Sequence, residues 1–161
     1  MPRKYRLEPL LRLKARARRQ AEMALARAIG DLEREKKRKE ELGEEKQNII
    51  DTKREVRQDL DQVLTSEQGM VSDSYRYTDY LRGLDDDEKQ KEREIERQEL
   101  VIDDAKIVVA RARRDYIDAA QEHKVMEKHK DLWEKRRQKE ISDREEKELD
   151  ELGQVIHQMS R

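Results

Sequence analysis

Apolar side chains recur along the first part of the chain in alternating steps of four and three residues. From Leu7 to Val63 this stepping visits 17 positions, and eleven of them are apolar, although only 34% of the chain is hydrophobic. Such an alternation is the heptad pattern of a coiled-coil seam. Polar side chains interrupt the seam at Glu35, Lys39, Lys46 and Lys53. We therefore expect a coiled coil of limited stability.

A second stripe of the same kind begins at Leu84. Ten of its 18 positions up to Arg144 are apolar, most densely from Ile95 to Met126. Beyond Trp133 the phase slips, because the remaining apolar residues follow another register, and such a stutter locally unwinds a supercoil. These residues are Ile141, Leu149, Leu152 and Ile156.

The segment between the two stripes contains residues typical of turns, namely Ser66, Gly69, Ser72, Asp73 and Ser74, with Gly83 a little further on. Ser, Asp and Gly compete with helix through local hydrogen bonds and backbone freedom. We predict one helix over about 6–68, a tip segment within about 65–85 and a second helix over about 73–158. The expected fold class is all-α: two long helices forming an antiparallel coiled-coil hairpin, with residues 1–161 as a single domain.

Composition supports long helices over the alternatives. Charged residues make up 48% of the chain, there is no phenylalanine or cysteine, and the two prolines are Pro2 and Pro9. So few apolar side chains cannot build a thick core, while Glu, Lys, Arg, Ala and Leu favour helix. No run approaches the ~20 apolar residues of a membrane-spanning helix.

Charge favours the antiparallel orientation. Residues 1–20 carry eight basic side chains against Glu8, and residues 140–151 carry seven acids against two bases. An antiparallel hairpin sets these segments against each other, whereas a parallel dimer of one continuous helix sets the basic segments side by side. A hairpin that itself dimerises is a further alternative, and the oligomeric state stays open. A hairpin centred near residue 78 pairs residues whose numbers sum to about 156, which predicts Trp133 against the stretch 23–28.

The chain offers no grouping typical of catalysis or metal binding. Its three histidines are not spaced as ligands on one helix face, and no cysteine can complete a site. The run from Asp85 to Glu88 lacks the spacing of a calcium loop. We therefore expect no enzymatic activity, metal or cofactor. The basic stretch from Lys14 to Arg19 leaves a nucleic-acid-binding arm as one alternative function.

Aromatic residues gather near the predicted tip. Tyr75, Tyr77 and Tyr80 lie within six residues, and Leu81 and Leu84 follow at helical spacing. These side chains can close the end of the seam by packing on Met70 and Val71, or they can form a small surface for docking a partner, since Tyr is enriched in binding hot spots. Both interpretations can hold for different members of the group.

Three segments resemble those of a known family. The opening from Tyr5 to Lys14, followed by Gln20 to Ala28, is similar to the start of FliJ/YscO-type proteins of flagellar and injectisome type III export systems. The segment from Tyr77 to Leu84 resembles the family's aromatic tip. The stretch that begins Trp133-Glu-Lys-Arg-Arg resembles its last helix, although Gly83 is an unusual helix residue for the tip.

The resemblance implies a non-catalytic stalk. Such proteins fold as an antiparallel hairpin, and the end that carries both termini enters the hexameric export ATPase, where it promotes ring assembly and ATP hydrolysis. The tip contacts the cytoplasmic domain of the export gate, and some members bind export chaperones. On this basis the ATPase-facing residues are Arg12, Lys14, Arg16, Arg18, Arg19, Lys135, Arg136 and Arg137. The gate-facing residues are Tyr77, Tyr80, Leu81 and Leu84.

The expected location is cytoplasmic, at the inner face of the inner membrane through these partners, without nucleic acid. A scaffolding coiled coil without an ATPase partner is the main alternative. The sequence leaves open whether the system is flagellar or an injectisome.

Overall fold

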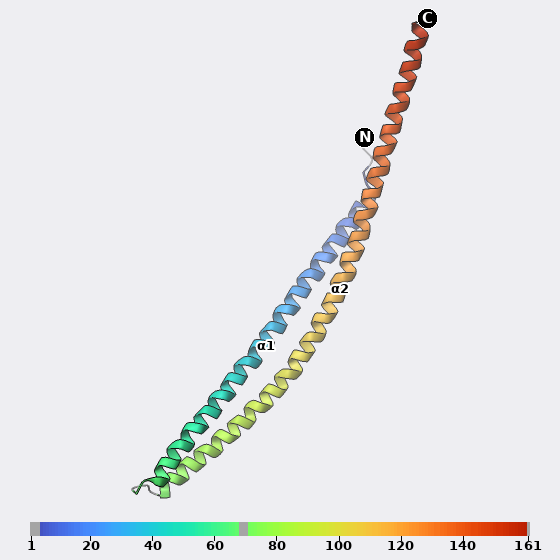
Figure 1. Cartoon of the computed structure of the whole chain (residues 1–161). Helices are drawn as coiled ribbons and strands as arrows, with labels where there is room; N and C mark the ends of the chain where they lie inside the picture. Colours follow the sequence, from blue (N-terminus) through green and yellow to red (C-terminus); the bar gives the residue numbers. More distant parts are fainter. Residues whose placement is uncertain (1–3, 68–70, 161) are drawn as a thin grey trace. The chain divides into compact units, whose positions relative to one another are not determined.

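The computed structural model describes residues 4–67 and 71–160, so Gly69 and Met70, which were assigned to the turn and to the packing of the tip, lie outside the described residues. Two helices account for nearly all of this part: α1 spans Glu8–Thr65 and α2 spans Val71–Met159. They run in opposite directions and pack against each other (Figure 1). The expected fold class, an all-α antiparallel hairpin, is confirmed.

Local sequence explains where the helices begin and end. Glu8 provides a carboxylate at the positive end of α1, and Pro9 sits in the first turn, where its missing N–H has no helical acceptor. The Tyr5 carbonyl accepts a hydrogen bond from the Glu8 N–H over 3.2 Å. At the other end α1 stops at Thr65, before the Ser-rich turn sequence. Gly83 does not break α2, because it lies inside the helix with an ordinary negative φ.

The two predicted stripes form the seam. Every position of the first stripe from Leu11 to Val63, and every position of the second from Leu84 to Arg137, is buried or half-buried. The most buried members are Ala28, Leu42, Val56, Leu84, Ile102 and Val109. A seam only one side chain wide leaves the rest of each helix in solvent, which fits the high charge of the sequence.

The chain divides into two compact units. Unit 1 comprises residues 1–24 and 113–161, and unit 2 comprises residues 25–112. Each unit contains one stretch of α1 and one stretch of α2. The assignment of residues 1–161 to a single domain stays a prediction.

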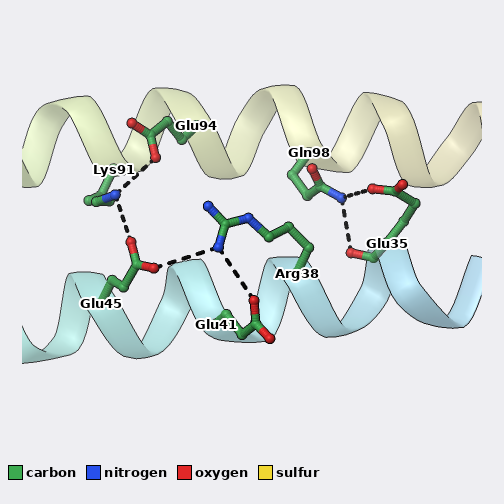
Figure 2. Close-up of polar contacts among 7 residues, drawn as sticks. All are labelled: Glu35, Arg38, Glu41, Glu45, Lys91, Glu94 and Gln98. Atoms are coloured by element: carbon green, nitrogen blue, oxygen red, sulfur yellow. Dashed lines mark hydrogen bonds and ion pairs between the residues drawn. The ribbon is translucent and has the colours of Figure 1, made fainter.

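In unit 2, polar side chains join the helices across the seam. Gln98 donates to a carboxylate oxygen of Glu35 over 2.5 Å and to the carbonyl of the same residue over 3.0 Å. A chain of ion pairs lies beside them, in which Lys91 bridges Glu94 of its own helix and Glu45 of the other, and Glu45 also meets Arg38 (Figure 2). The polar seam positions therefore have partners instead of being mere gaps in the core.

The observed pairing corrects the predicted register. Lys39 meets Glu99 at 2.8 Å, and Lys46 meets Glu92 at 3.0 Å, so paired numbers sum to 138 and not to about 156. The difference arises because residue 78, the predicted centre of the hairpin, lies inside α2, which already begins at Val71, whereas α1 ends at Thr65. The prediction that Trp133 faces residues 23–28 is consequently wrong: its ring lies 5.5 Å from that of Tyr5.

The same shift changes which charges meet in unit 1. Glu8, at the start of α1, pairs with Lys130 at 3.1 Å, and Lys14 pairs with Glu122 at 2.5 Å. α2 then continues past the start of α1 (Figure 1). Residues 138–159, which we call the overhang, are exposed throughout. The expected pairing of the basic segment 1–20 with the acidic segment 140–151 is therefore wrong for this hairpin.

In the described ranges, neither helix has a stretch apolar enough to span a membrane.

Candidate partner-binding surfaces

A shallow hollow lies between the start of α1 and the facing part of α2 in unit 1. We call it the basic hollow. Five of its lining residues are basic, two are acidic, and the others are aromatic or aliphatic. The lining comprises Lys4, Tyr5, Arg6, Glu8, Pro9, Arg12, Leu13, Arg16, Lys130, Trp133 and Glu134. Such a mixture suits a partner that presents both acidic and apolar groups.

An aromatic contact holds the segment before α1 on α2. Tyr5 is only 7% exposed, although it precedes the first helical residue. Its hydroxyl oxygen lies 2.6 Å from Nδ1 of His129, and its ring lies 5.5 Å from that of Trp133. Arg137 adds a cation–π contact, with its guanidinium carbon 5.7 Å from the centre of the indole ring. These contacts fix one wall of the basic hollow.

The two acids that line the hollow are Glu8 and Glu134. Glu8 forms ion pairs with Lys130 and Arg12. The hydrogen bond from Lys130 lowers the pKa of Glu8, and Arg12, at 3.6 Å, acts in the same direction. In return, the Glu8 carboxylate raises the pKa of Lys130. Lys130 is thus largely committed to Glu8, whereas Arg16 lies exposed at the rim.

The predicted ATPase-facing residues of α1 fall into two groups. Arg12, Arg16 and Arg19 are exposed, and the first two line the basic hollow. Lys14 and Arg18 are half-buried seam residues: Lys14 pairs with Glu122, and Nη1 of Arg18 lies 3.5 Å from Nδ1 of His123. These two side chains therefore hold the helices together before any partner binds.

The predicted residues of α2 also separate. Lys135 and Arg136 are exposed and do not line the hollow, whereas Arg137 lies over Trp133. Sequence reasoning missed Tyr5 and Lys130 as members of this surface. A correct register would have found both. Paired numbers that sum to 138 set Lys130 opposite Glu8 and Trp133 opposite Tyr5.

At the other predicted surface, in unit 2, the four tip residues are not equivalent. Leu84 is 8% exposed and belongs to the seam. Tyr77 and Leu81 continue the same stripe and are half-buried, whereas Tyr80 is 54% exposed. Tyr77 and Tyr80 line a shallow hollow together with Val63, Asp73 and Arg76. A partner can thus reach Tyr80, part of Tyr77 and part of Leu81, but not Leu84.

Comparison with known proteins gives two matches that cover the chain. A family model described as YscO-like protein matches residues 1–161. The solved structure of CT670 from Chlamydia trachomatis, described as that of a proposed YscO homolog, has a TM-score of 0.73 and 26% sequence identity, covering 98% of this chain and 97% of that one. No curated protein sequence matches the chain significantly. Both matches agree with the resemblance given by the three sequence segments.

Proposed function

The chain belongs to the YscO-like family, and from this premise we propose that it is the non-catalytic stalk of a type III export ATPase. In this role the exposed basic residues of unit 1 contact the ATPase ring, and the tip residues of unit 2 contact the export gate. The observation that carries the proposal is the family match over residues 1–161, together with an antiparallel hairpin of the matching fold.

The distribution of side chains supports a contact between unit 1 and the ring. Arg12, Arg16 and Arg19 stand exposed on α1, and Lys135 and Arg136 stand exposed on α2. Exposed charges of one sign steer a partner of opposite sign and set its orientation without requiring a deep pocket. Within the described residues, unit 1 consists of one stretch of α1 and one stretch of α2 joined by a single seam, which suits a part of a protein that has to fit inside a ring.

The tip surface supports a second, smaller contact. Tyr80 is exposed beside the half-buried Tyr77, and the two flank a hollow that also contains Arg76. An exposed tyrosine next to a partly filled hollow is a typical anchor for a partner side chain. We assign this surface to the export-gate domain. Binding of export chaperones and a position at the cytoplasmic face of the inner membrane stay predictions that follow from the same role.

The test is the hydrolysis rate of the cognate export ATPase with and without the purified chain. We expect stimulation by the wild-type chain and its loss, by roughly tenfold or more, when Arg12, Arg16 and Arg19 are all changed to Glu, because three exposed charges of about 0.5 kcal/mol or more each are reversed. Changing Tyr77 and Tyr80 to Ala should leave stimulation intact and abolish binding to the gate domain.

A matched control uses charges in unit 2. Arg93 and Arg97 are also exposed, on α2, so changing both to Glu alters the net charge without touching either surface. This variant should stimulate the ATPase like the wild type. If the wild-type chain neither stimulates nor co-sediments with the ATPase, the stalk role is wrong and a scaffolding coiled coil becomes the better account.

A further inference from the structure

The overhang carries a coiled-coil stripe for which its own hairpin provides no partner among the described residues. Its positions follow steps of four and three and are Ile141, Glu145, Glu148, Leu152, Val155 and Met159. Leu149 and Ile156, which are 68% and 65% exposed, flank the stripe on one side and widen its apolar face. The apolar members are between 45% and 83% exposed. An amphipathic stripe at heptad spacing is the normal requirement for packing on another helix, so its exposure over 22 residues indicates a missing partner.

Two of the stripe positions identify the chemistry of that partner. Glu145 and Glu148 lie between the apolar positions and would be covered together with them, so a surface that binds the stripe has to supply cations. The whole overhang has seven acids against three bases, a net charge of −4. Two overhangs packed only on each other would therefore repel, and a basic groove with apolar side chains is the complementary surface.

The basic hollow of the same unit has this character. Leu13, which is 59% exposed, and Trp133 offer apolar contacts, and Arg12 and Arg16 offer cations at its rim. It lies between two antiparallel helices, the kind of groove into which a third helix packs. The overhang cannot reach it within one molecule, because α2 is a single unbroken helix from Val71 to Met159 and would have to fold back on itself.

We propose that two copies of this chain associate through these surfaces, with the overhang of each copy lying antiparallel in the basic hollow of the other. A two-fold axis near residue 138 sets residues 142–150 of one copy level with residues 126–134 of its partner. The overhang is about 33 Å long at 1.5 Å per residue. Two symmetric contacts of that length and about 10 Å width reach the ~1,200–2,000 Å² of a specific interface.

The proposed dimer goes beyond the stalk role and does not rest on it. It covers Arg12 and Arg16, two of the residues assigned to the ATPase ring, so the dimer and the ring-bound form exclude each other. Self-association would keep the apolar stripe of the overhang covered until the ATPase ring competes for Arg12 and Arg16. The two proposals are tested separately, since one experiment contains only this chain and the other requires the ATPase.

The experiment is sedimentation equilibrium of the full chain in 100 mM salt. We expect a monomer–dimer equilibrium in the micromolar range that weakens at least tenfold in 500 mM salt, because ionic strength screens the rim charges. A base variant, Arg12→Glu with Arg16→Glu, and an overhang variant, Glu145→Lys with Glu148→Lys, should each be monomeric. Mixing them should restore a dimer, because acidic overhang then meets basic hollow and basic overhang meets acidic hollow.

The outcomes are distinct. The substitutions introduce only Glu and Lys, which are good helix formers, so each variant should keep the helicity of the wild type. A circular dichroism spectrum therefore separates lost association from lost folding. The Arg93→Glu with Arg97→Glu control should dimerise like the wild type. A wild-type chain that stays monomeric up to the millimolar range overturns the proposal and leaves the hollow for a different acidic partner. A dimer that survives either reversal, or a mixture that stays monomeric, also overturns it.

Discussion

At the scale of single residues, charged side chains inside the seam hold the helices in register. Lys53 shows this most clearly: its side chain is 12% exposed and forms ion pairs with Asp85 and, at 2.5 Å, with Glu88. The hydrogen bonds that Lys53 donates to these two carboxylates raise its pKa, and the bond to Asp85 is the stronger cause. A heptad stripe of leucines alone would tolerate a sliding of one helix along the other, whereas such a bridge fits a single register.

Replacing Lys53 should therefore destabilise the hairpin. We expect Lys53→Ala to lower the free energy of unfolding by about 1–2 kcal/mol, because Asp85 and Glu88, three residues apart on α2, then lose the cation that bridges them to α1. Arg54→Ala is the matched control, since Arg54 is exposed and lies 3.8 Å from Asp51 of its own helix; its effect should stay below about 0.5 kcal/mol. Urea denaturation followed by circular dichroism measures both. Equal effects of the two substitutions would contradict a role for Lys53 in the seam.

The ion pairs also define a pH range of greatest stability. Hydrogen bonds from Lys53 and Lys91 lower the pKa values of Asp85 and Glu94, so their contribution is present above the unfolded-state pKa and is lost as pH falls below about 4. The partners raise the pKa values of Lys53 and Lys91, so that contribution is present below the unfolded-state pKa and is lost as pH rises above about 10. Urea midpoints should therefore form a plateau between these limits. Midpoints that rise steadily on acidification below pH 4 would contradict this account.

Tyr5 and Trp133 provide a direct reporter for unit 1, because Trp133 is the single tryptophan of the chain. We expect Tyr5→Ala to shift the tryptophan emission to longer wavelength, as the indole gains water, and to lower stability by about 2 kcal/mol. Tyr5→Phe keeps the ring contact and loses only the hydrogen bond with His129. It should leave the emission unchanged and cost about 1 kcal/mol. An unchanged emission in Tyr5→Ala would show that the contact does not form in solution.

At the scale of the helices, the sequence predicts the elements well and their pairing poorly. The heptad steps identify both seams almost residue by residue, because burial along a two-helix contact is periodic. The pairing depends on where the chain reverses, and turn residues are spread from Ser66 to Gly83. The predicted start of the second helix near residue 73 is close to the observed Val71, but the hairpin was centred near residue 78, inside that helix. Gly83 lies in the same helix, because glycine is tolerated where tertiary packing stabilises a helix. The error moved every cross-helix pair, including that of Trp133.

The wrong register also affected which residues were assigned to the partner-binding surfaces. Arg12 and Arg16 were identified correctly as exposed basic residues, because their positions lie off the seam, but the residues that face them across the hollow could not be known without the register. Leu84 was placed at a partner surface although its position is on the seam. Whether a side chain is free for a partner follows from the pairing and not from residue type, which is why Lys14 and Arg18 turned out to be engaged.

The helix-interior glycines offer a test of element stability. Gly30 and Gly43 lie inside α1, and a Cβ added at either position meets nothing within 4 Å beyond its chain neighbours and the helix's own backbone. We expect Gly30→Ala and Gly43→Ala to raise the free energy of unfolding by about 0.5–1 kcal/mol each, because alanine loses less backbone entropy in a helix. Ala26→Gly, at an exposed position of the same helix, should lower it by a similar amount. A loss of stability in the alanine variants would show that these glycines serve a contact absent from the isolated chain.

At the scale of the whole molecule, stability is distributed unevenly along the chain. Apart from Tyr5, the buried side chains of the described residues lie in unit 2, whereas the overhang of unit 1 is exposed along its whole length and has only its own helical hydrogen bonds. An isolated helix of this length is marginal in water, so its order depends on what packs against it. A segment of low local stability is well suited to exchanging one partner for another, because little of its own structure has to be broken.

Amide hydrogen exchange should reveal this distribution directly. At low micromolar concentration, where the proposed dimer is largely dissociated, we expect amides of residues 138–159 to exchange at least about 100-fold faster than those around Leu42 and Ile102, which lie in the seam. On raising the concentration to several hundred micromolar, protection should increase in residues 138–159 and around the basic hollow, but not around Leu42. The Glu145→Lys with Glu148→Lys variant is the control and should show no such increase. Equal protection of the overhang and the seam at the lowest concentration would mean that the overhang already has a packing partner within one molecule, and the docking of a second copy would then have no free stripe to cover.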